Sequence, residues 1–405
     1  MATYFIFCKR MKYLLIIFCF FNSIFSIAQK EYGIDAIFKF AHQIERLNIS
    51  EEKLSELPHE ISSCKKLKEL NLKNNQLTEL PLWISDLSGL EVLDISGNRN
   101  LNIKNTFDVI SKLPNLKVLK ASGCKMFYLP ISVRKIKTLK KVDLSNNFIA
   151  SLPPILEELF WNDLDISANC IDTLPSSMVY MTSLKKLNLS YTPAAINKHN
   201  YYMLEYLRNM KTLVLSGMNK IPKELAKLTS IEELILTNGT FKNFPIGIKK
   251  LKRLKHVDVR GCENLNVSDL IEQISTASKK LQTLKIGHYS LDGLPFNMFK
   301  LKKIKQLFID NSCINSLPTS FNKFKGKSVI FRHCTFSTPE KVFKNLGKAK
   351  NLKNLEINSC LFGHNNWKIS RSLTLEKINI INCGLVKIPL VPLEFPKLKK
   401  LNLMG

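Results

Sequence analysis

The chain has 405 residues, and its 60 Lys and Arg against 33 Asp and Glu give a formal net charge of +27. The composition is otherwise that of an ordinary soluble protein, and the length excludes a chain too short to bury a large core. The positive charge favours acidic or polyanionic partners, but an AT-rich coding bias toward Lys, Asn, Ile and Phe is the explanation that we favour.

Residues 1–28 have the pattern of a signal peptide for export. A positive region precedes the apolar segment 13–21, and Gln29 follows small residues that suit cleavage. The positive residues are Lys9, Arg10 and Lys12, and the small residues are Ser26 and Ala28. Cleavage before Gln29 removes 3 of the 60 positive residues and no acidic ones, so 57 minus 33 leaves a net charge of +24.

Two alternatives to this leader remain open. Translation could begin at Met11, because the segment from Met11 onward is the more usual leader. An uncleaved segment could instead anchor the chain in a membrane, although the apolar stretch is shorter than the roughly 20 residues that a spanning helix needs. We expect a secreted, cell-surface or periplasmic protein with no stable membrane span after cleavage.

Residues 29–43 place Ile34, Ile37, Phe38 and Ala41 at helical spacing. This pattern predicts an amphipathic helical cap. A cap is needed because the open end of a stack of repeats exposes its apolar interior.

The segment Leu67–Gly89 is the unit from which the rest of the chain is built. It reads L-x-x-L-x-L-x-x-N-x-L-x-x-L-P-x-x-I-x-x-L-x-x, and we number its positions from Leu67 as position 1. Leu70 and Leu72 are two residues apart, so they face the same side of a short strand. Pro81 then predicts an irregular return leg or a short helical turn. One repeat cannot bury its apolar face alone, but stacked repeats can.

The repeats fill residues 44–405, with about fifteen complete copies and one that is cut short. Successive copies are 21 to 27 residues apart, most often 23. Four longer repeats begin at Leu90, Leu184, Leu254 and Gly326, and their extra residues fall in the return leg. We expect a true helix in each, and in the third of them Asp269 has the character of an N-cap. The last copy stops at its position 8 without a visible cap, so a fragment of a longer protein remains an open alternative.

Position 9 predicts a structural ladder inside the stack. Its members are Asn75, Asn98, Cys124, Asn147, Asn169, Cys262, Cys334, Cys360 and Cys383. A buried Asn can bond the backbone of its own and the neighbouring repeat, and Cys is small enough to replace it. We therefore expect reduced, buried cysteines, although a disulfide among the last three is conceivable.

These features resemble the leucine-rich repeat family, in its 23-residue L-x-x-L-x-L-x-x-N/C-x-L-x-x-L-P form. The resemblance covers residues 44–405 and implies an α/β solenoid: a curved right-handed horseshoe with a parallel β-sheet on its concave face and an irregular or helical convex side. It also implies a binding role, usually toward another protein, and offers no catalytic residues. The repeat at Gly326 departs from the pattern because it lacks Leu at position 1.

Positions 3, 5 and 7 of each strand point away from the core, onto the concave face. Position 5 is apolar in two adjacent pairs of repeats, Val214 with Ile235 and Phe308 with Ile330. Exposed apolar pairs are our main candidates for partner binding, although a neighbouring Arg or Tyr could cover them. Earlier repeats instead carry Asp94, Asp143 and Asp165 at this position, which could bind a basic partner or are merely soluble filler, and we favour filler. Asp143 and Asp165 belong to adjacent repeats and could also chelate a cation.

Lys occupies position 2 in ten repeats and predicts a basic ridge that a polyanion or an envelope surface could bind. A solvated ridge is the plainer interpretation, and no specific nucleic-acid motif accompanies it. The sequence has no nucleotide-binding loop or zinc-protease motif, so we expect no enzyme activity, cofactor or metal. The preferred function is an exported scaffold that binds a protein partner; the alternatives are a polyanion binder and the recognition half of a longer enzyme.

Overall fold

The computed structural model describes residues 32–277, 280–288, 293–363, 368–384 and 394–404. The expected signal peptide lies outside these residues. The chain divides into two compact units, which are described separately. The N-terminal unit comprises Met1–Phe148 and Glu158–Trp161, and the C-terminal unit comprises Ile149–Glu157 and Asn162–Gly405.

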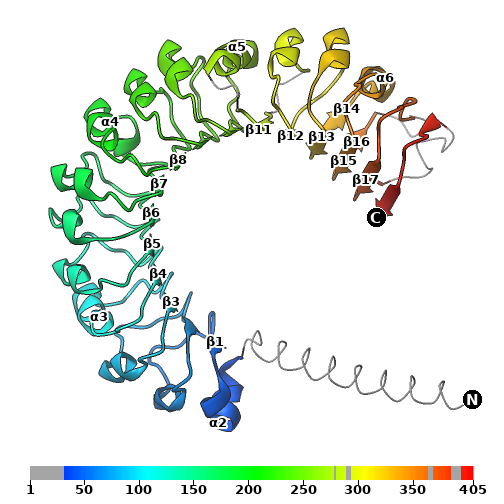
Figure 1. The fold of residues 1–405 in the computed structure, drawn as a ribbon. Coiled ribbons are helices and arrows are strands. Elements are labelled where there is room, and N and C mark those ends of the chain that lie inside the picture. Colours follow the sequence, from blue (N-terminus) through cyan, green and yellow to red (C-terminus); the bar gives the residue numbers. More distant parts are fainter. Residues whose placement is uncertain (1–31, 278–279, 289–292, 364–367, 385–393, 405) are drawn as a thin grey trace, which may run out of the picture. The chain divides into compact units, whose positions relative to one another are not determined.

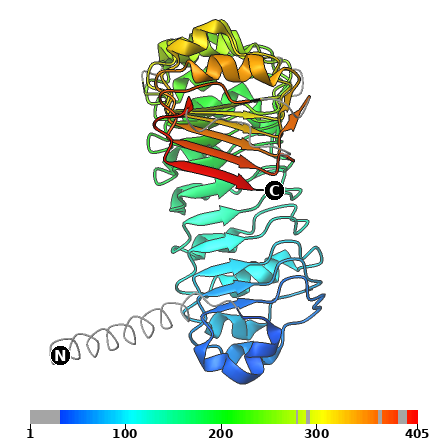
Figure 2. The same ribbon diagram turned by 90° about the vertical axis from the view of Figure 1, so that its right-hand side faces the viewer.

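Each unit is built on parallel strands that pair in the order of the sequence. The N-terminal unit contains β1 (Arg46–Asn48), β2 (Glu69–Asn71), β3 (Val92–Asp94), β4 (Val118–Lys120) and β5 (Lys141–Asp143). The C-terminal unit contains β6 (Asp163–Asp165), β7 (Lys186–Asn188), β8 (Thr212–Val214), β9 (Glu233–Ile235), β10 (His256–Asp258), β11 (Thr283–Ile286), β12 (Gln306–Asp310), β13 (Ser328–Arg332), β15 (Asn354–Asn358), β17 (Lys377–Ile381) and β18 (Lys400–Met404). Within each unit the strands point the same way (Figure 2).

The return legs carry the helical segments, which in each unit lie on the outer side of the curve while the strands line the inner side (Figure 1). The α-helices are α2 (Ile37–Phe40), α3 (Ile103–Ile110), α4 (Lys198–Leu204), α5 (Val267–Ala277) and α6 (Pro339–Gly347). The 3₁₀ helices are Ile34–Ala36, Ala41–Gln43, His59–Ser63, Leu82–Asp86, Ile131–Lys135, Leu156–Glu158, Ser176–Tyr180, Pro193–Ala195, Lys223–Lys227, Ile246–Lys250, Phe296–Lys300 and Thr319–Lys323. None of the helices in the described residues has the length and apolar composition needed to cross a bilayer.

Repeat length decides which kind of helix forms. The four longer repeats contain α3, α4, α5 and α6, as expected, and repeats of ordinary length form 3₁₀ turns after Pro. Pro81 is typical, since its carbonyl accepts from the Ile84 amide at the start of Leu82–Asp86. The predicted cap of α5 is wrong: the helix begins at Val267, and the Asn266 side chain accepts from the Asp269 amide. Asp269 therefore lies in the first turn, where its charge suits the helix dipole.

The interior is the aliphatic column that the repeat predicts. Leu70, Leu72 and Leu77 are each at most 1 % exposed. Burial of each such side chain contributes about 2 kcal/mol, so the stack is stabilised along its length. At Gly326, where the repeat lacks Leu, the stacked rings of Phe321 and Phe324 are fully buried and Phe324 occupies the space beside the glycine. The described part of the cap region is helical, with Ile37 buried and Phe38 exposed.

Candidate functional site

The candidate site is the sheet face, which we define as the side chains at positions 3, 5 and 7 of each repeat. Val214 and Ile235 lie there as register partners on β8 and β9, and both are half-buried. The Thr212 hydroxyl donates to the Glu233 carboxylate (3.0 Å) on one side of this pair. Ser216 and Thr237 share a hydroxyl hydrogen bond (2.7 Å) on the other. Apolar side chains flanked by satisfied polar groups have the organisation of a protein interface, with a dry centre and a polar rim.

The second apolar pair, Phe308 and Ile330, joins β12 to β13 in register. Phe308 is only 9 % exposed. The guanidinium carbons of Arg260 and Arg332 lie 5.3 and 5.2 Å from the centre of its ring, so both make cation–π contacts. The possibility that a neighbouring Arg covers this pair is therefore realised, and Ile330 is the more accessible member.

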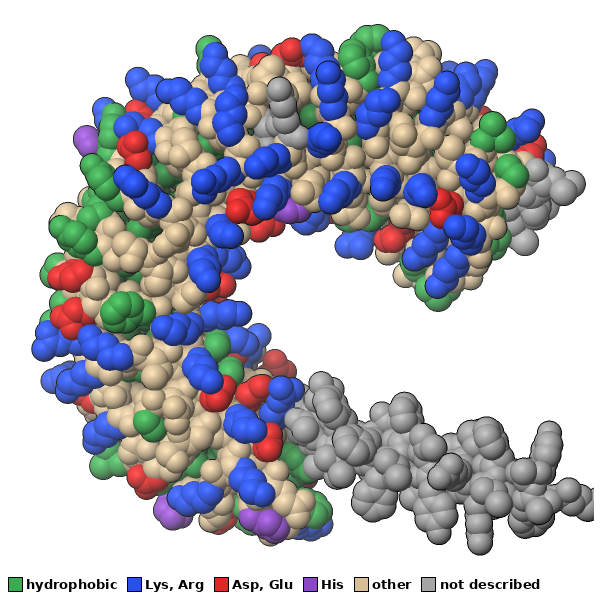
Figure 3. Space-filling view, viewed as in Figure 1, with side chains coloured by type: hydrophobic (Ala, Val, Ile, Leu, Met, Phe, Trp, Pro, Cys, Tyr) green, Lys and Arg blue, Asp and Glu red, His purple; other side chains and the backbone are tan. Residues whose placement is uncertain are grey.

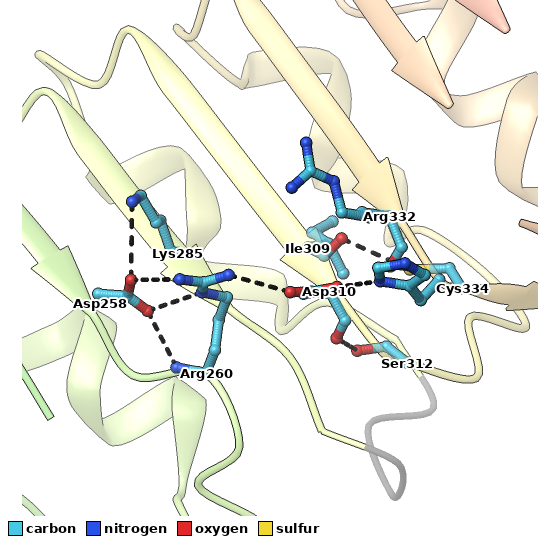
Figure 4. Close-up of polar contacts among 9 residues, drawn as sticks. Asp258, Arg260, Lys285, Ile309, Asp310, Ser312, Arg332 and Cys334 are labelled. Atoms are coloured by element: carbon cyan, nitrogen blue, oxygen red, sulfur yellow. Dashed lines mark hydrogen bonds and ion pairs between the residues drawn. The ribbon is translucent and has the colours of Figure 1, made fainter. Parts of the chain in front are cut away.

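A chain of charges passes beside this ring, and Figure 4 shows its carboxylates and cations. Arg260 donates from Nε and Nη2 to the two oxygens of Asp258, at 3.0 and 2.9 Å, and from Nη1 to Asp310 at 3.0 Å. Hydrogen bonds with Asp258 raise the pKa of Arg260 above its ordinary value, which burial alone would lower. Lys285 adds a second cation 3.6 Å from Asp258, and His333 lies 3.2 Å from Asp310. The Arg260 guanidinium is thus held in one orientation by two carboxylates.

Gly287 makes this bridge possible. Arg260 and Asp310 belong to repeats on either side of β11, and Gly287 follows β11 in the repeat between them. It has a φ of +139°, and a Cβ added to it would lie 1.8 Å from the Asp310 carbonyl oxygen. Only glycine adopts this conformation without strain, so the residue leaves the sheet face clear for the guanidinium to pass.

The acidic side chains of the earlier repeats are used locally. Asp94, Asp143 and Asp165 each accept from the amide of the Ser two residues later, at 2.9 to 3.0 Å. Asp94 also lies 3.5 Å from the Lys120 ammonium, and the second oxygen of Asp165 accepts from Asn188 at 2.8 Å. These bonds give the L-D-L-S pattern a structural role at the end of each strand. Within the described residues, no cluster of three or more His, Cys, Asp or Glu could hold a metal ion.

The Lys ridge at position 2 is interrupted by glutamates at the same position. Six of its lysines pair with one of these glutamates in a neighbouring repeat, at 2.5 to 3.5 Å: Lys68, Lys117, Lys211, Lys255, Lys353 and Lys399. Lys353 and Lys399 lie on either side of Glu376 and lower the pKa of its carboxyl to about 2. Figure 3 shows Lys and Arg spread over the visible surface of each unit, with carboxylates among them.

The position-9 side chains occupy the interior of the turn after each strand. Asn98 donates to the carbonyls of Leu72 and Ile95, both at 2.9 Å, and accepts from the Leu77 amide at 3.2 Å. Asn75 and Asn147 make equivalent bonds. Cys124 and Cys262 donate instead to single carbonyls of the preceding repeat, at 3.2 and 3.0 Å. The eight cysteines in the described residues are free thiols. Of the ladder members, Cys124, Cys262, Cys334 and Cys360 are buried as expected, but Cys383, near the end of the stack, is only partly buried.

Sequence reasoning missed Arg260, Arg332 and Gly287. A signal for them exists, because position 7 is mostly Ser in the earlier repeats and becomes Arg260, Gly287, Asp310 and Arg332 in four consecutive repeats. Apolar residues at position 5 drew attention to the same strands. The charged residues two positions later set the charge of this part of the sheet face.

Comparisons with known proteins agree on the repeat. Residues 66–87 match the Leucine Rich Repeat family. The adenylate cyclase of Schizosaccharomyces pombe is 24 % identical over 377 residues, which are 87 % of this chain and 20 % of that protein. The chain thus spans about a fifth of this relative's length.

Solved structures agree on the fold. A leucine-rich repeat protein of Leptospira interrogans superimposes with a TM-score of 0.57 at 21 % identity, over 92 % of this chain and 99 % of that one. The structure of a TLR13–ssRNA13 complex gives a TM-score of 0.63 at 20 % identity, over 93 % of this chain and 65 % of that one. At these identities the likeness concerns the α/β repeat solenoid.

Proposed function

We propose that the chain, which is a leucine-rich repeat protein, is a non-catalytic exported scaffold that binds a protein partner through the sheet face of its C-terminal unit. The observation that carries this proposal is the pair Val214 and Ile235, two half-buried aliphatic side chains in register between hydrogen-bonded polar pairs. Covering such a pair with an apolar group of a partner removes its remaining surface from water at little polar cost.

Ile330 and Phe308 form the second contact region of the proposed surface. Phe308 contributes chiefly through the two guanidiniums that it supports, and Ile330 offers the accessible apolar group. Aromatic-supported Arg side chains are common centres of binding energy at interfaces. We assign Asp94, Asp143 and Asp165 a smaller contribution, since their oxygens already accept bonds from the chain.

The test is capture of a partner by the full chain, followed by substitution on the sheet face. The double variant Val214→Asp, Ile235→Asp places two carboxylates in the proposed contact and is expected to lose binding by at least about a hundredfold. Ile246→Asp is the matched control, because Ile246 is 75 % exposed on a 3₁₀ helix of a return leg. Partner binding that survives the double variant, or that the control abolishes equally, would refute the proposal.

Export is supported by the leader pattern of residues 1–28. Expression in a secreting host, followed by N-terminal sequencing of the exported protein, is expected to find Gln29 as the first residue. Retention of the intact leader in the membrane fraction would favour the anchored alternative.

A polyanion binder is the weaker candidate, because glutamates neutralise six of the ten ridge lysines. Salt titration separates the two functions. Binding through the ridge weakens steeply as salt rises, whereas binding through Val214 and Ile235 changes little. The third alternative, the recognition part of a longer enzyme, is tested by reading the gene beyond Gly405.

A further inference from the structure

Arg332 lies beside the chain of charges in the C-terminal unit but makes no ion pair among the described residues. Asp310 and Arg332 are register neighbours on β12 and β13, yet Asp310 bonds elsewhere. One of its oxygens accepts from Arg260 and the other lies within reach of His333. In Figure 4 the Arg332 guanidinium is turned away from Asp310. Arg332 therefore lacks the ion pair that its nearest cross-strand acid would ordinarily supply.

The rest of the Arg332 side chain is held in place. Its guanidinium carbon lies 5.2 Å from the centre of the Phe308 ring. Its Nε is buried and has no hydrogen-bond partner among the described residues. A guanidinium has five donors, and a buried donor without an acceptor is costly. The terminal donors on Nη1 and Nη2 also have no hydrogen-bond partner among the described residues, and Arg332 is partly exposed. This aromatic-backed terminal fork is therefore prepared to receive an acceptor from outside.

The surroundings select the charge of that acceptor. Arg260 is already neutralised by Asp258 and Asp310. Glu356, the register partner of Ile330 on β15, adds a further negative charge nearby. These carboxylates would repel a dianionic phosphate, whereas a single carboxylate matches one free guanidinium fork in charge and in geometry. Lys305 and Lys327, which precede β12 and β13 without an ion pair in the described structure, add positive charge at the start of these strands.

We propose that Arg332 anchors a carboxylate of an acidic, extended peptide segment of the partner, with an adjoining apolar side chain of that segment against Ile330. This inference rests on the proposed function and specifies which chemical group of the partner is bound. The carboxylate accepts two parallel hydrogen bonds from Arg332. Phe308 supports the Arg332 cation from behind, and the Arg260 bridge keeps the Asp310 carboxylate from competing for it.

The test uses the full chain and a short fluorescein-labelled peptide that carries one Glu followed by Val among neutral polar residues. Fluorescence anisotropy is expected to show saturable binding that weakens at least about tenfold in Arg332→Gln. Arg332→Lys keeps the charge but loses the fork, so it is expected to weaken binding severalfold with an unchanged Tm. The matched control is Arg253→Gln, at an exposed Arg of the same unit that precedes β10, and it should bind as the wild type does.

Two further peptides decide the chemistry. A peptide in which Gln replaces Glu is expected not to bind, and one in which phosphoserine replaces Glu is expected to bind more weakly than the Glu peptide. Equal binding by the Gln peptide, tighter binding by the phosphoserine peptide, or full affinity in Arg332→Gln would overturn the inference.

The outcomes separate this inference from the proposed function. Suppose that the double variant Val214→Asp, Ile235→Asp abolishes partner capture while Arg332→Gln leaves both partner and peptide binding intact. The scaffold function then stands and the carboxylate anchor fails. If the peptide binds through Arg332 but the chain captures no protein partner, the anchor stands and the scaffold function fails.

Discussion

The repeats of the N-terminal unit and the later repeats of the C-terminal unit close the turn after the strand in different ways. In the N-terminal unit the strands have three residues, and the amide of Leu77 donates to the Asn98 side chain of the next repeat. Around β12 and β13 the strands have five residues, and the equivalent amide of Ile314 donates to the backbone carbonyl of Thr335. The same backbone donor is thus satisfied by a side chain in one region and by the main chain in the other.

This difference accounts for Cys334 and Cys360 in the later repeats, whereas Cys124 and Cys262 replace Asn after strands of three residues. A second, two-stranded parallel sheet, β14 (Thr335–Phe336) with β16 (Leu361–Phe362), follows the Cys positions of the C-terminal unit. Main-chain pairing there supplies the acceptors, so position 9 needs only a small side chain with one weak donor. The Cys334 thiol lies 3.3 Å from the Arg332 carbonyl and 3.5 Å from that of Ile309.

The largest expected effect concerns glycines in the two units. Gly287→Ala should lower the free energy of unfolding by roughly 3 kcal/mol, because the residue has a φ of +139° and its Cβ would collide with the Asp310 backbone. Gly123 in the N-terminal unit has a φ of +68°, and an added Cβ would make only ordinary contacts there, 3.9 and 4.0 Å from the Gly97 backbone, so Gly123→Ala should cost only about 1 kcal/mol. Urea denaturation measures both, and equal losses would contradict the steric argument.

The next effect tests the Asn ladder. Asn98→Cys should lower the free energy of unfolding by roughly 2 kcal/mol, because the Leu77 amide loses its acceptor and no main-chain carbonyl replaces it. Wild-type stability in this variant would show that Asn and Cys are interchangeable at position 9. The same urea titration provides the measurement.

A smaller effect, which depends on pH, is expected for the cysteines at position 9. Cys262→Ala should cost about 1 kcal/mol near pH 7. Burial raises the pKa of the Cys262 thiol from 9.0 to about 11. Because the folded pKa is the higher one, the stability that the thiol contributes is complete below pH 9 and is lost as pH rises to about 11.

The difference between wild type and Cys262→Ala should therefore shrink by about 1 kcal/mol per pH unit above pH 9, reach zero near about pH 10 and be reversed at about pH 11. Urea titrations with reductant at several pH values between 8 and 11 follow the difference. A gap that stays constant would show that the thiol is not buried.

The smallest effect is expected at the ridge. Lys117 and Glu91 form an exposed ion pair at 2.8 Å, so Lys117→Gln should change the free energy of unfolding by no more than about 0.5 kcal/mol. The change should shrink further in high salt, which thermal unfolding at two salt concentrations can resolve. A loss above about 1 kcal/mol would assign the ridge a structural role that surface pairs do not ordinarily have.

Local periodicity was enough to predict the repeat fold. Aliphatic residues at fixed spacing specify stacked parallel strands, and the extra residues after Leu90, Leu184, Leu254 and Gly326 specify α3 to α6, because each repeat must close its own return leg. The N-cap of α5 was misassigned because Asn266 and Asp269 are both plausible caps by type, and only the backbone geometry distinguishes them.

The surface chemistry was decided by tertiary contacts. Arg260 reaches Asp310 across fifty residues of sequence, and its guanidinium and that of Arg332 cover the ring of Phe308. Residue type alone marks Phe308 as an exposed apolar candidate, since periodicity reports which way a side chain points and not what lies over it. Burial of a column of Leu follows from spacing within each repeat, whereas the pairing of charges on the sheet face depends on which strands become neighbours.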